Sequence, residues 1–462
     1  MARGRIASSL MLHLVSLCGI VVILAICFVF SRDRSAIKWR LVGVGLTIQA
    51  ILGLLFLYWD AGNRALQGVG EGVDGFLKLS EAGSYFVFNA LTKPELVNGA
   101  MPDQSGGFVF AFMVLPTLIF FSSFMAVLYH MGVMQWIVRC MAYVMVRLLG
   151  TSGSESLSAC GNVFVGQTEA PLLVKPFLDK MTLSELHAVM VGGFATIAGG
   201  VFALYVGFGV DAGNLMVGSV MAVPAGLICT KMLWPETEVS ETMGAVGKID
   251  GAGYGNVVEA AAGGAGDGLK LALNVGAMLI AFLGLVAVLN AGLGWLNDSW
   301  SVEGGLAIVF WPIAAVMGVP WDEIPILAEL LGTKIAVTEL VAYSKLGPMI
   351  AEEQISDRTA LIASFALCGF ANFGSVAIQV GGLGAMAPGR RADLAKIGLR
   401  AMFAGALATC MTACVAGVLA SGLGVITRFP PCRNQPNNPT CPTSLPQRPF
   451  AHGARERAGV VG

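Results

Sequence analysis

Charged residues are scarce in this sequence. Only 12% of the 462 residues are Asp, Glu, Lys or Arg, while 56% are hydrophobic. A soluble domain typically carries roughly 25% charged residues, so the composition excludes a soluble globular fold. It predicts a chain that crosses a lipid bilayer several times. The 60 glycines fit this interpretation, because small residues let membrane helices pack closely or break.

Two kinds of functional signature are also missing. The basic residues are scattered in short loops and the formal net charge is −1, so no Lys/Arg stripe could follow a phosphate backbone. A nucleic-acid polymer is therefore not an expected partner. The four histidines form no HExxH motif and the ten cysteines form no CxxC or Cys/His cluster, which argues against a metalloenzyme. We interpret eight of the cysteines as small apolar fillers.

Eight apolar segments are predicted to be transmembrane helices. They cover residues 10–30, 41–59, 107–129, 186–208, 213–231, 269–292, 358–381 and 397–424. The basic loop 32–40 is placed in the cytoplasm by the positive-inside rule, and the remaining basic loops agree with that orientation. The shorter stretch 302–319 contains Pro312 and is predicted to be a partly embedded helix.

Four segments are predicted to lie outside the bilayer. Residues 60–105 are expected to form an external interfacial helix and loop. Residues 136–150 are expected to form an amphipathic helix on the inner surface. The acidic, Gly/Ala-rich segment 232–268 is predicted to be a cytoplasmic connector, and the Pro-rich tail 426–462 is predicted to be disordered.

Two further apolar segments are interrupted by polar residues. Ser156–Phe177 contains the stretch GNVFVGQTEAP, and residues 325–345 contain a second Thr-Glu pair at Thr338 and Glu339. Non-helical backbone persists at membrane depth only where protein or a water-filled cavity satisfies its polar groups. Both segments are therefore predicted to be re-entrant hairpins, the first with its turn near Val165–Pro171. By charge they enter from opposite sides, as inverted repeats would.

The predicted span after each hairpin is interrupted as well. GGFATIAGGV (Gly192–Val201) follows the first hairpin, and FALCGFANFGSVAIQVGG (Phe365–Gly382) follows the second. Both carry glycine with hydroxyl or amide side chains in mid-span. Broken helices expose carbonyl and amide groups that can coordinate an ion. Four polar elements are thus predicted to converge near the midplane of the bilayer.

The two glutamates of these hairpins require an explanation. An acidic residue at the bilayer centre costs roughly 2.5 to 3.5 kcal/mol on insertion scales. Glu169 and Glu339 could each be a structural acid, protonated or paired with Lys175 or Lys334. We favour the alternative that each carboxylate accepts hydrogen bonds from hydroxyls of a polar ligand, because charge-assisted bonds are stronger than neutral ones.

Neighbouring polar residues extend this predicted ligand site. Gln167 offers both a donor and an acceptor, which complement an amide-like edge. Asn372 and Ser375 are three residues apart and share a helix face, with Phe370 nearby as an apolar surface for a ring. The pattern predicts a hydroxylated ring ligand. The alternatives are that Asn372 and Ser375 only bond across helices and that Phe370 only packs.

Several long motifs resemble one known family. GNVFVGQTEAPLLVKPF, ATIAGGV, ALNVGAMLIAFLGL, ELLGTKIAVTELVAYSKL and ALCGFANFGSVAIQVGGLGAMAPGRR are similar, in the same order, to motifs of the concentrative nucleoside transporters, in their bacterial eight-span form. The resemblance runs from about residue 40 to residue 424. It implies an all-α membrane protein with eight transmembrane helices and two re-entrant hairpins of opposite orientation. It also implies a homotrimer in which a mobile transport domain shifts like an elevator against scaffold helices.

The resemblance also implies the binding residues. The residues that would contact the nucleoside are Gln167, Thr168, Glu169, Val201, Glu339, Phe370, Asn372 and Ser375. Those that would coordinate sodium, several through backbone carbonyls, are Asn162, Val165, Thr196 and Ile197. One departure is visible, because the family's usual Asn-Glu-Phe is here Thr338, Glu339 and Leu340. The acid is kept and its neighbours differ, which leaves the substrate range open.

These observations predict five regions. Residues 1–150 hold the N-terminal scaffold and interfacial helices, and 151–231 hold the first hairpin and two spans of the transport domain. Residues 232–322 hold the connector, a scaffold span and the partly embedded helix. Residues 323–425 hold the second hairpin and last two spans of the transport domain, and 426–462 form the tail.

The predicted function is cation-coupled import of nucleosides across the inner membrane. Gln167 after Gly166 suggests pyrimidine or broad selectivity, with uridine and cytidine as candidates and adenosine as a further one. Sodium is the preferred coupling ion, because Asn162 and Thr196 supply oxygens suited to a hard cation. Proton coupling through Glu169 or Glu339 is the alternative. No organic cofactor is expected.

A channel and an intramembrane enzyme are the alternative classes of function. A channel can also use carboxylates and carbonyls in its selectivity filter, but the paired hairpins argue against it. An intramembrane enzyme could use Glu169 and Glu339 as an acid/base pair, but no nucleophile or metal cluster in the sequence supports it.

Overall fold

The computed structural model is helical throughout the part of the chain that it describes. It describes residues 2–59, 62, 68, 75, 79–93, 96–97, 109–113, 115–167, 169–197, 199–244, 254–297 and 300–420. Within these ranges the only strand-like pairing is a single antiparallel bridge between Ser152 and Met243.

The helices of the N-terminal half are α1 (Ala2–Val29), α2 (Trp39–Gly53), the π-helix η1 (Leu54–Tyr58), the 3-10 turn η2 (Asn89–Thr92), α5 (Phe110–Met113), α6 (Leu115–His130), α7 (Val133–Leu149), α8 (Gly153–Gly161), the 3-10 helix η3 (Ala170–Lys180), α9 (Leu183–Ala195), α10 (Gly199–Gly207) and α11 (Ala212–Leu233). Those of the C-terminal half are α12 (Val257–Leu296), α13 (Val302–Val316), α14 (Ile324–Ala336), α15 (Glu339–Ala351), α16 (Asp357–Leu367), α17 (Phe373–Met386), the 3-10 turn η4 (Pro388–Arg390) and α18 (Arg391–Leu419).

Local capping signals fix where the interrupted helices begin. Ser152 and Thr182 each form a capping box with the glutamate three residues later, at the starts of α8 and α9. Thr338 and Asn372 cap α15 and α17 by accepting hydrogen bonds from backbone amides of the first turn. A cap satisfies amides that have no intrahelical partner, so a helix can restart in the middle of an apolar segment.

All four predicted interruptions are confirmed. The first hairpin consists of α8 and η3, which pack together across a bend whose described residues, 162–167 and 169, are not helical. The second consists of α14 and α15, separated by Val337 and Thr338. The predicted spans 186–208 and 358–381 are each two short helices, α9 with α10 and α16 with α17. The order of elements is therefore the same in both halves, a broken hairpin followed by a broken helix and then a long helix.

Among the residues that the structure describes, five helices are long and apolar enough to cross a membrane by length and composition: Leu10–Val29, Trp39–Leu57, Ala111–His130, Ala212–Leu233 and Pro388–Leu419. Each of the other predicted spans is helical where it is described, but is broken or, for 269–292, lies inside the 40-residue helix α12. The segment 232–268 was predicted to be a connector. This prediction is wrong for residues 257–268, which form the first turns of α12. Asn256 caps this helix through a hydrogen bond from the amide of Glu259.

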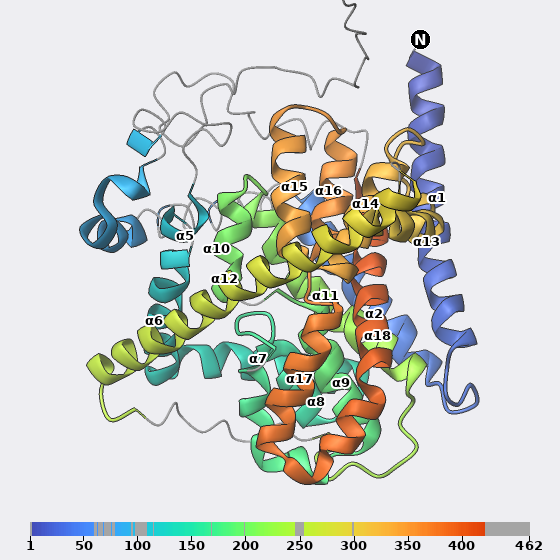
Figure 1. Ribbon diagram of the computed structural model, residues 1–462. Coiled ribbons are helices and arrows are strands. Elements are labelled where there is room, and N and C mark those ends of the chain that lie inside the picture. The colour runs from blue at the N-terminus through green and yellow to red at the C-terminus, as the bar shows by residue number, and fades with distance from the viewer. Residues whose placement is uncertain are drawn as a thin grey trace, which may run out of the picture.

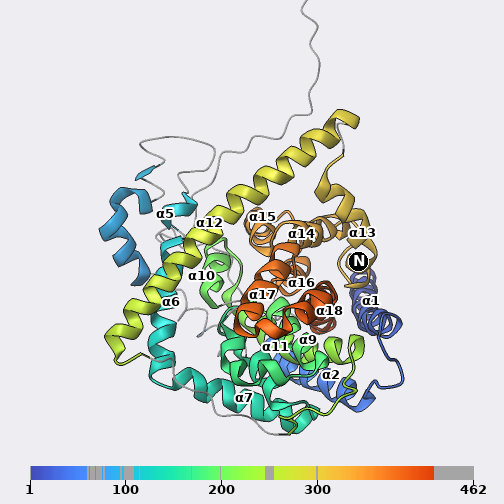
Figure 2. The same cartoon turned by 60° about the horizontal axis from the view of Figure 1, so that its bottom comes forward.

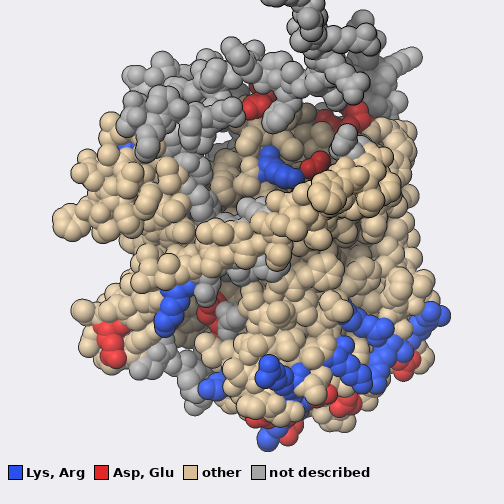
Figure 3. All heavy atoms as spheres, viewed as in Figure 1, with Lys and Arg blue, Asp and Glu red and all other residues tan. Residues whose placement is uncertain are grey.

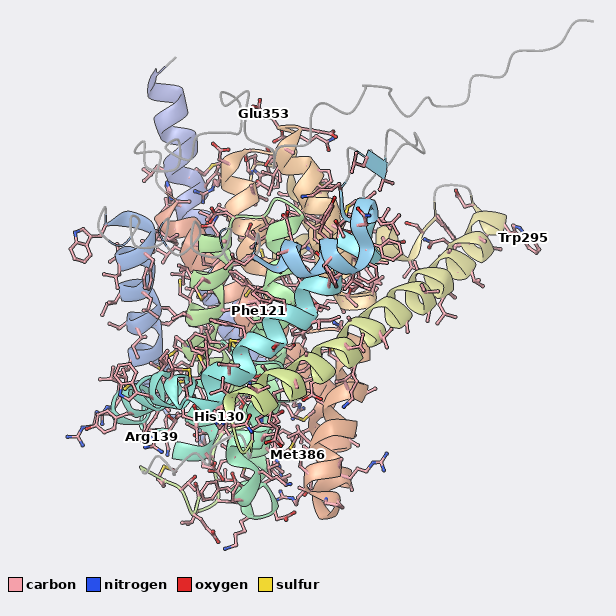
Figure 4. The ribbon with its side chains drawn as sticks, turned by 90° about the vertical axis from the view of Figure 1, so that its left-hand side faces the viewer. Phe121, His130, Arg139, Trp295, Glu353 and Met386 are labelled. Carbon is pink, nitrogen blue, oxygen red and sulfur yellow. The ribbon has the colours of Figure 1, made fainter. Side chains whose placement is uncertain are left out.

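The helices form a central bundle with flanking helices (Figures 1 and 2). The interrupted helices pack with α11 and α18 at the centre. α12 runs diagonally along one side and packs against α6, whereas α1 and α2 lie on the other side, against α18 and α11. Figure 4 shows α12 passing from the neighbourhood of His130 out to Trp295, whose side chain is 94% exposed. The exposed face of α12 thus extends well beyond the bundle.

The breaks of the two interrupted helices touch each other. Gly369, in the break between α16 and α17, has φ of +108°, and a Cβ at this position would lie 2.5 Å from the carbonyl oxygen of Phe194. Phe194 is in the last turn of α9. Only glycine tolerates both the dihedral angle and this close approach. The end of α9 and the start of the second break therefore meet at the centre of the bundle.

The basic loops gather at one end of the molecule, as the charge pattern predicts. The amide of Arg32 donates to the carbonyl of Leu233 at the end of α11, and the Arg390 guanidinium donates to the carbonyls of Asp179 and Met181 at the end of η3. Figure 3 shows Lys and Arg side chains concentrated at the lower end, below a band that is mostly uncharged.

Several other predicted segments can be compared only in part. The predicted inner-surface helix is α7, which buries one apolar face and exposes Arg139 and Arg147. Of the predicted external segment, residues 79–92 are described and helical. The predicted tail 426–462 lies outside the described residues. The predicted partly embedded helix is α13, which packs on α14.

Candidate functional site

Glu339 lies at the centre of the site. It is the first residue of α15, and only 3% of it is exposed. One carboxylate oxygen accepts a hydrogen bond from the Tyr205 hydroxyl of α10 at 3.0 Å, and the other accepts from the side-chain amide of Asn372 at 3.1 Å. The carboxylate thereby joins the second hairpin to both interrupted helices. Buried carboxylates need such partners, because the charged group has lost its water.

Asn372 has two roles at once. Its amide nitrogen donates to Glu339, while its side-chain oxygen accepts from the backbone amide of Ser375 at 2.8 Å. The cap of α17 therefore fixes the orientation of the amide toward the carboxylate. This arrangement depends on the break, because the amide of Ser375 would have an intrahelical partner in a continuous helix.

Gln167 extends the polar chain to the first hairpin. Its amide nitrogen donates to the Ser375 hydroxyl at 3.2 Å, and its oxygen accepts from the side-chain amide of Gln379 at 3.0 Å. Gln379 also donates to the carbonyl of Met190 in α9 at 3.1 Å. Gln167, Glu339, Asn372 and Ser375, all predicted from the sequence, are thus joined in one buried network.

Aromatic and apolar side chains border this network. The rings of Tyr205 and Tyr343 pack against each other in a tilted arrangement, with centroids 4.4 Å apart and an interplanar angle of 32°. Val201 lies one turn before Tyr205 in α10 and is buried, and Phe370 is partly buried against the core. The predicted residues Val201 and Phe370 therefore belong to the elements that form the network, one at the start of α10 and one in the break before α17.

Of the other two predicted ligand residues in the first hairpin, only Glu169 is described. Glu169 occupies the position before η3 and its side chain is exposed, whereas Gln167, two residues earlier, is buried. Thr168 lies outside the described residues. Lys334, an alternative partner for either glutamate, instead donates to the carbonyls of Ala366 and Cys368 and to the Thr409 hydroxyl.

Three of the four predicted sodium ligands lie near the end of α9. Asn162, at the end of α8, donates to the carbonyl of Ser158 at 2.9 Å, and its side-chain oxygen is buried with no partner among the described residues. A Cβ on Gly192 of α9 would lie 3.2 Å from the Asn162 amide nitrogen. Thr196 ends α9 and is buried, with its hydroxyl donating to the carbonyl of Gly192 at 2.8 Å.

Of the other two predicted sodium ligands, Ile197 lies at the same place and Val165 lies in the bend of the first hairpin. Ile197 follows Thr196, is buried, and its amide donates to the Ser219 hydroxyl of α11 at 3.4 Å. Val165 is partly buried in the bend of the first hairpin. Neutral oxygens in this arrangement suit a hard monovalent cation. The free Asn162 oxygen is the strongest sign that the residues present fit such an ion, because a buried acceptor without a partner is costly.

Sequence reasoning missed two residues of the network. Tyr205 donates to Glu339 and Gln379 donates to Gln167. Gln379 was recognisable, because Asn372, Ser375 and Gln379 repeat at helical spacing and so form one polar face. For Tyr205 the signal was weaker, since a tyrosine in an apolar helix usually indicates packing alone.

The fold and this network define a secondary transporter, since paired interrupted helices that meet around buried polar residues are characteristic of that class. Three family models match the chain: "Na+ dependent nucleoside transporter N-terminus" at residues 18–91, "Nucleoside recognition" at 111–212 and "Na+ dependent nucleoside transporter C-terminus" at 214–417. The chain belongs to the concentrative nucleoside transporter family.

Individual relatives agree with this assignment. The solved structure of CNTnw in an inward-facing substrate-bound state superimposes with a TM-score of 0.84 at 44% identity, covering 88% of this chain and 99% of that one. An uncharacterized transporter of Haemophilus influenzae is 43% identical over 418 residues, covering 88% of this chain and 98% of the relative. Sodium/nucleoside cotransporter 1 of Mus musculus is 43% identical over 433 residues, covering 89% of this chain but only 65% of the relative. The chain thus spans slightly less than two thirds of that longer protein.

The family assignment settles two broader points. The family consists of transporters and is not a family of catalytic enzymes. Together with the long apolar helices, it identifies this chain as an integral membrane protein.

Proposed function

We propose that this protein is a sodium-coupled importer of nucleosides. The observation that carries the proposal is the buried network in which the Glu339 carboxylate and the Gln167 amide face the same break of α16 and α17. A carboxylate accepts hydrogen bonds from hydroxyls, and an amide pairs with a donor–acceptor edge. A nucleoside carries both kinds of group, on its sugar and on its base.

The sugar would bind at the second hairpin. Each oxygen of Glu339 holds one donor, from Tyr205 or Asn372, and each oxygen has a further lone pair for a ribose hydroxyl. The base would bind near Gln167, with Val201 and Phe370 as apolar neighbours. Thr338 and Leu340 flank Glu339 and are the positions where we expect the substrate range to be set.

The coupling ion would bind at the end of α9. Asn162, Val165, Thr196 and Ile197 come from the first hairpin and the first broken helix, the same elements that carry Gln167 and Val201. An ion at this place would hold the hairpin bend against the break. Sodium binding would thereby order the half of the site that recognises the base, which couples the two ligands.

Proton coupling is the second candidate. Glu339 is buried, and intramembrane acids are the titrating groups of proton-coupled carriers. If Glu339 took up the coupling proton, it would have to release the hydrogen bonds from Tyr205 or Asn372. The hypothesis therefore predicts that nucleoside and proton compete for the same oxygens.

The arrangement of the elements supports a division into a transport domain that moves and a scaffold that holds it. The transport domain would comprise residues 151–231 and 323–425, with both hairpins acting as re-entrant elements of inverted repeats. Scaffold helices from residues 1–150 and 232–322, including the outlying α12, would hold it in a homotrimer of the inner membrane, and the transport domain would move as an elevator.

Uptake of radiolabelled uridine into proteoliposomes tests the proposal. The purified protein is reconstituted and assayed with an inward sodium gradient, an inward proton gradient, or neither. We expect accumulation with sodium alone. Accumulation with protons alone would transfer the coupling to Glu339, and equilibration without any gradient would indicate a channel or facilitator. Failure to move uridine, cytidine or adenosine under every gradient would overturn the nucleoside assignment.

A further inference from the structure

The two halves that share one order of elements, α8 to α11 and α14 to α18, are called here the first and second repeat. In each repeat, the first part of the broken helix ends inside the protein. α9 ends at Ala195 and α16 ends at Leu367, and both ends lie beside the breaks that meet at Gly369. The last carbonyls of a helix have no intrahelical partner, and they carry the negative end of the helix dipole. Each of these two ends is therefore a place where a positive charge is stabilised.

At the end of α16 the positive charge is supplied by a lysine side chain of the protein. Lys334 is 1% exposed, and its amino group donates to the carbonyl oxygens of Ala366 at 2.9 Å and Cys368 at 3.3 Å and to the Thr409 hydroxyl at 3.0 Å. The Thr409 hydroxyl hydrogen is itself donated to the carbonyl of Ala406, so Thr409 can only accept from Lys334. Three acceptors require three N–H hydrogens, which only the protonated amine has.

At the end of α9 the described side chains are different. Asn162 lies beside Gly192 and Thr196 donates back to the carbonyl of Gly192, and no described lysine or arginine donates to the last carbonyls of α9. Asn162 and Lys334 occupy similar places in their repeats, because each lies at the C-terminal end of the first helix of its hairpin. One repeat thus has an asparagine whose oxygen has no partner among the described residues where the other has a lysine.

We propose that Lys334 is a tethered cation, a built-in counterpart in the second repeat of the coupling ion in the first. Its ammonium group holds α14 against the end of α16 and so fixes the break that carries Phe370 and Asn372. The sugar half of the site is therefore formed without an external ion, and only the base half depends on one. The inference rests on the proposed function, and it implies that one cation moves with each nucleoside.

Two substitutions at Lys334 separate this role from packing. Lys334→Ser removes the ammonium group and leaves the carbonyls of Ala366 and Cys368 with the Thr409 hydroxyl around a space that a sodium ion can enter, because such oxygens suit hard cations. Lys334→Met fills the same space with an apolar chain of similar length, so no ion can enter. Lys345→Met is the control, because Lys345 lies in the same hairpin and pairs at the partly exposed surface with Glu329 at 3.0 Å.

The experiment measures uridine binding to the purified full-length protein over a series of sodium concentrations, with choline chloride keeping the ionic strength constant. For the wild type and Lys345→Met we expect a sodium Hill coefficient of about 1, rising toward about 2 in Lys334→Ser as a second site is created. Lys334→Met should bind uridine at least about tenfold more weakly at every sodium concentration, with its Hill coefficient unchanged. The thermal unfolding temperature of Lys334→Ser should rise with sodium, and not with choline, more steeply than that of the wild type.

The outcomes separate this inference from the proposed function. Uridine binding by the wild type that does not depend on sodium would overturn the proposed function and the inference with it. Sodium-dependent wild-type binding would overturn the inference alone in any of three cases. These are a Lys334→Ser protein with wild-type sodium dependence, one that aggregates at every sodium concentration, and a Lys334→Met protein with wild-type affinity for uridine.

Discussion

The carboxylate of Glu339 connects three helices through two hydrogen bonds, and neither donor is a charged group. Tyr205 and Asn372 supply these donors from α10 and α17. Glu339 does not form an ion pair with Lys334, which was the alternative prediction. The lysine donates instead to the carbonyls of Ala366 and Cys368 at the end of α16. A carboxylate held only by neutral donors keeps its acceptor capacity for a ligand.

We expect Glu339→Gln to weaken uridine binding severely. A glutamine presents an amide nitrogen, a donor, in place of one acceptor oxygen, so either Tyr205 or Asn372 no longer faces an acceptor there, and the ribose loses a charged partner. Hydrogen bonds to charged groups are worth about 1.5–3 kcal/mol, or roughly 10- to 100-fold in affinity. Uptake and equilibrium binding both report the change. Glu329→Gln is the matched control, because this glutamate of α14 has a side chain that is 47% exposed. Wild-type uptake in the Glu339 variant would remove this residue from the site.

The paired tyrosines allow a second comparison at this scale. Tyr205 and Tyr343 are both fully buried and their tilted rings are in contact, but the Tyr343 hydroxyl donates to the carbonyl of Ser364 at 2.8 Å and not to Glu339. Tyr205→Phe should lower uridine affinity by roughly 5- to 10-fold, less than Glu339→Gln, because the Tyr205 hydroxyl acts on the ligand only by positioning the carboxylate. Tyr343→Phe should lower the unfolding temperature with little change in affinity. Equal effects on affinity would show that the Tyr205 hydroxyl does not position the carboxylate.

At the scale of elements, the site exists because helices stop inside the protein. A continuous helix would satisfy the amide of Ser375 and the carbonyl of Cys368 internally, and Asn372 and Lys334 would then have no partners there. The two breaks touch at Gly369, whose positive φ and close contact with Phe194 leave no room for a side chain. The convergence of the two repeats therefore depends on one residue without a Cβ.

Gly369→Ala tests this contact between the breaks. A Cβ at this position would lie 2.5 Å from the Phe194 carbonyl oxygen, so the second break must move away from α9. The dihedral strain alone is worth about 1–3 kcal/mol, and we expect a lower unfolding temperature together with loss of uridine uptake. Gly381→Ala is the control, because this glycine of α17 has open space around its Cβ direction. It should be neutral or stabilise the protein by up to about 1 kcal/mol. A Gly369→Ala protein with normal uptake would contradict the proposed convergence.

At the scale of the whole molecule, a buried polar cluster ties segments from distant parts of the sequence together at the basic end. The Lys231 ammonium group of α11 lies 2.6 Å from a carboxylate oxygen of Glu155 in α8 and 3.4 Å from one of Glu236 in the connector. Glu185 of α9 accepts a hydrogen bond from Ser240 of the same connector. The first hairpin, its broken helix, α11 and residues 234–243 are therefore held as one unit.

Lys231→Met should destabilise this unit strongly. Removing the cation leaves two buried carboxylates uncompensated, and breaking a buried pair in this way costs about 3–5 kcal/mol. The unfolding temperature in detergent is the measurement. Lys270→Met is the control, because Lys270 pairs with Asp267 at the surface, with side chains 77% and 67% exposed, and exposed pairs contribute about 0–1 kcal/mol. Similar unfolding temperatures for the two variants would show that the cluster does not hold the unit together.

The sequence by itself determined most of the elements of this protein, although not the start of α12. Its low charge and long apolar segments required membrane helices, and the polar residues around Glu169, Thr196, Thr338 and Asn372 showed where helices break. These are local effects, because a cap, a glycine or a buried polar group acts within a few residues of its own position. The motifs that resemble the family are also local features, because each is a short stretch of sequence that can be recognised without knowing its contacts.

Only the tertiary structure decided which polar residues meet. Gln167 contacts Ser375 across 208 positions of sequence and Tyr205 reaches Glu339 across 134, and no local pattern specifies such pairs. Folding also placed Lys334 on the end of α16 and left the Asn162 oxygen without a partner among the described residues. A side chain's partners depend on how the two repeats pack against each other, and that packing is set by the sum of many buried contacts rather than by any single stretch of sequence.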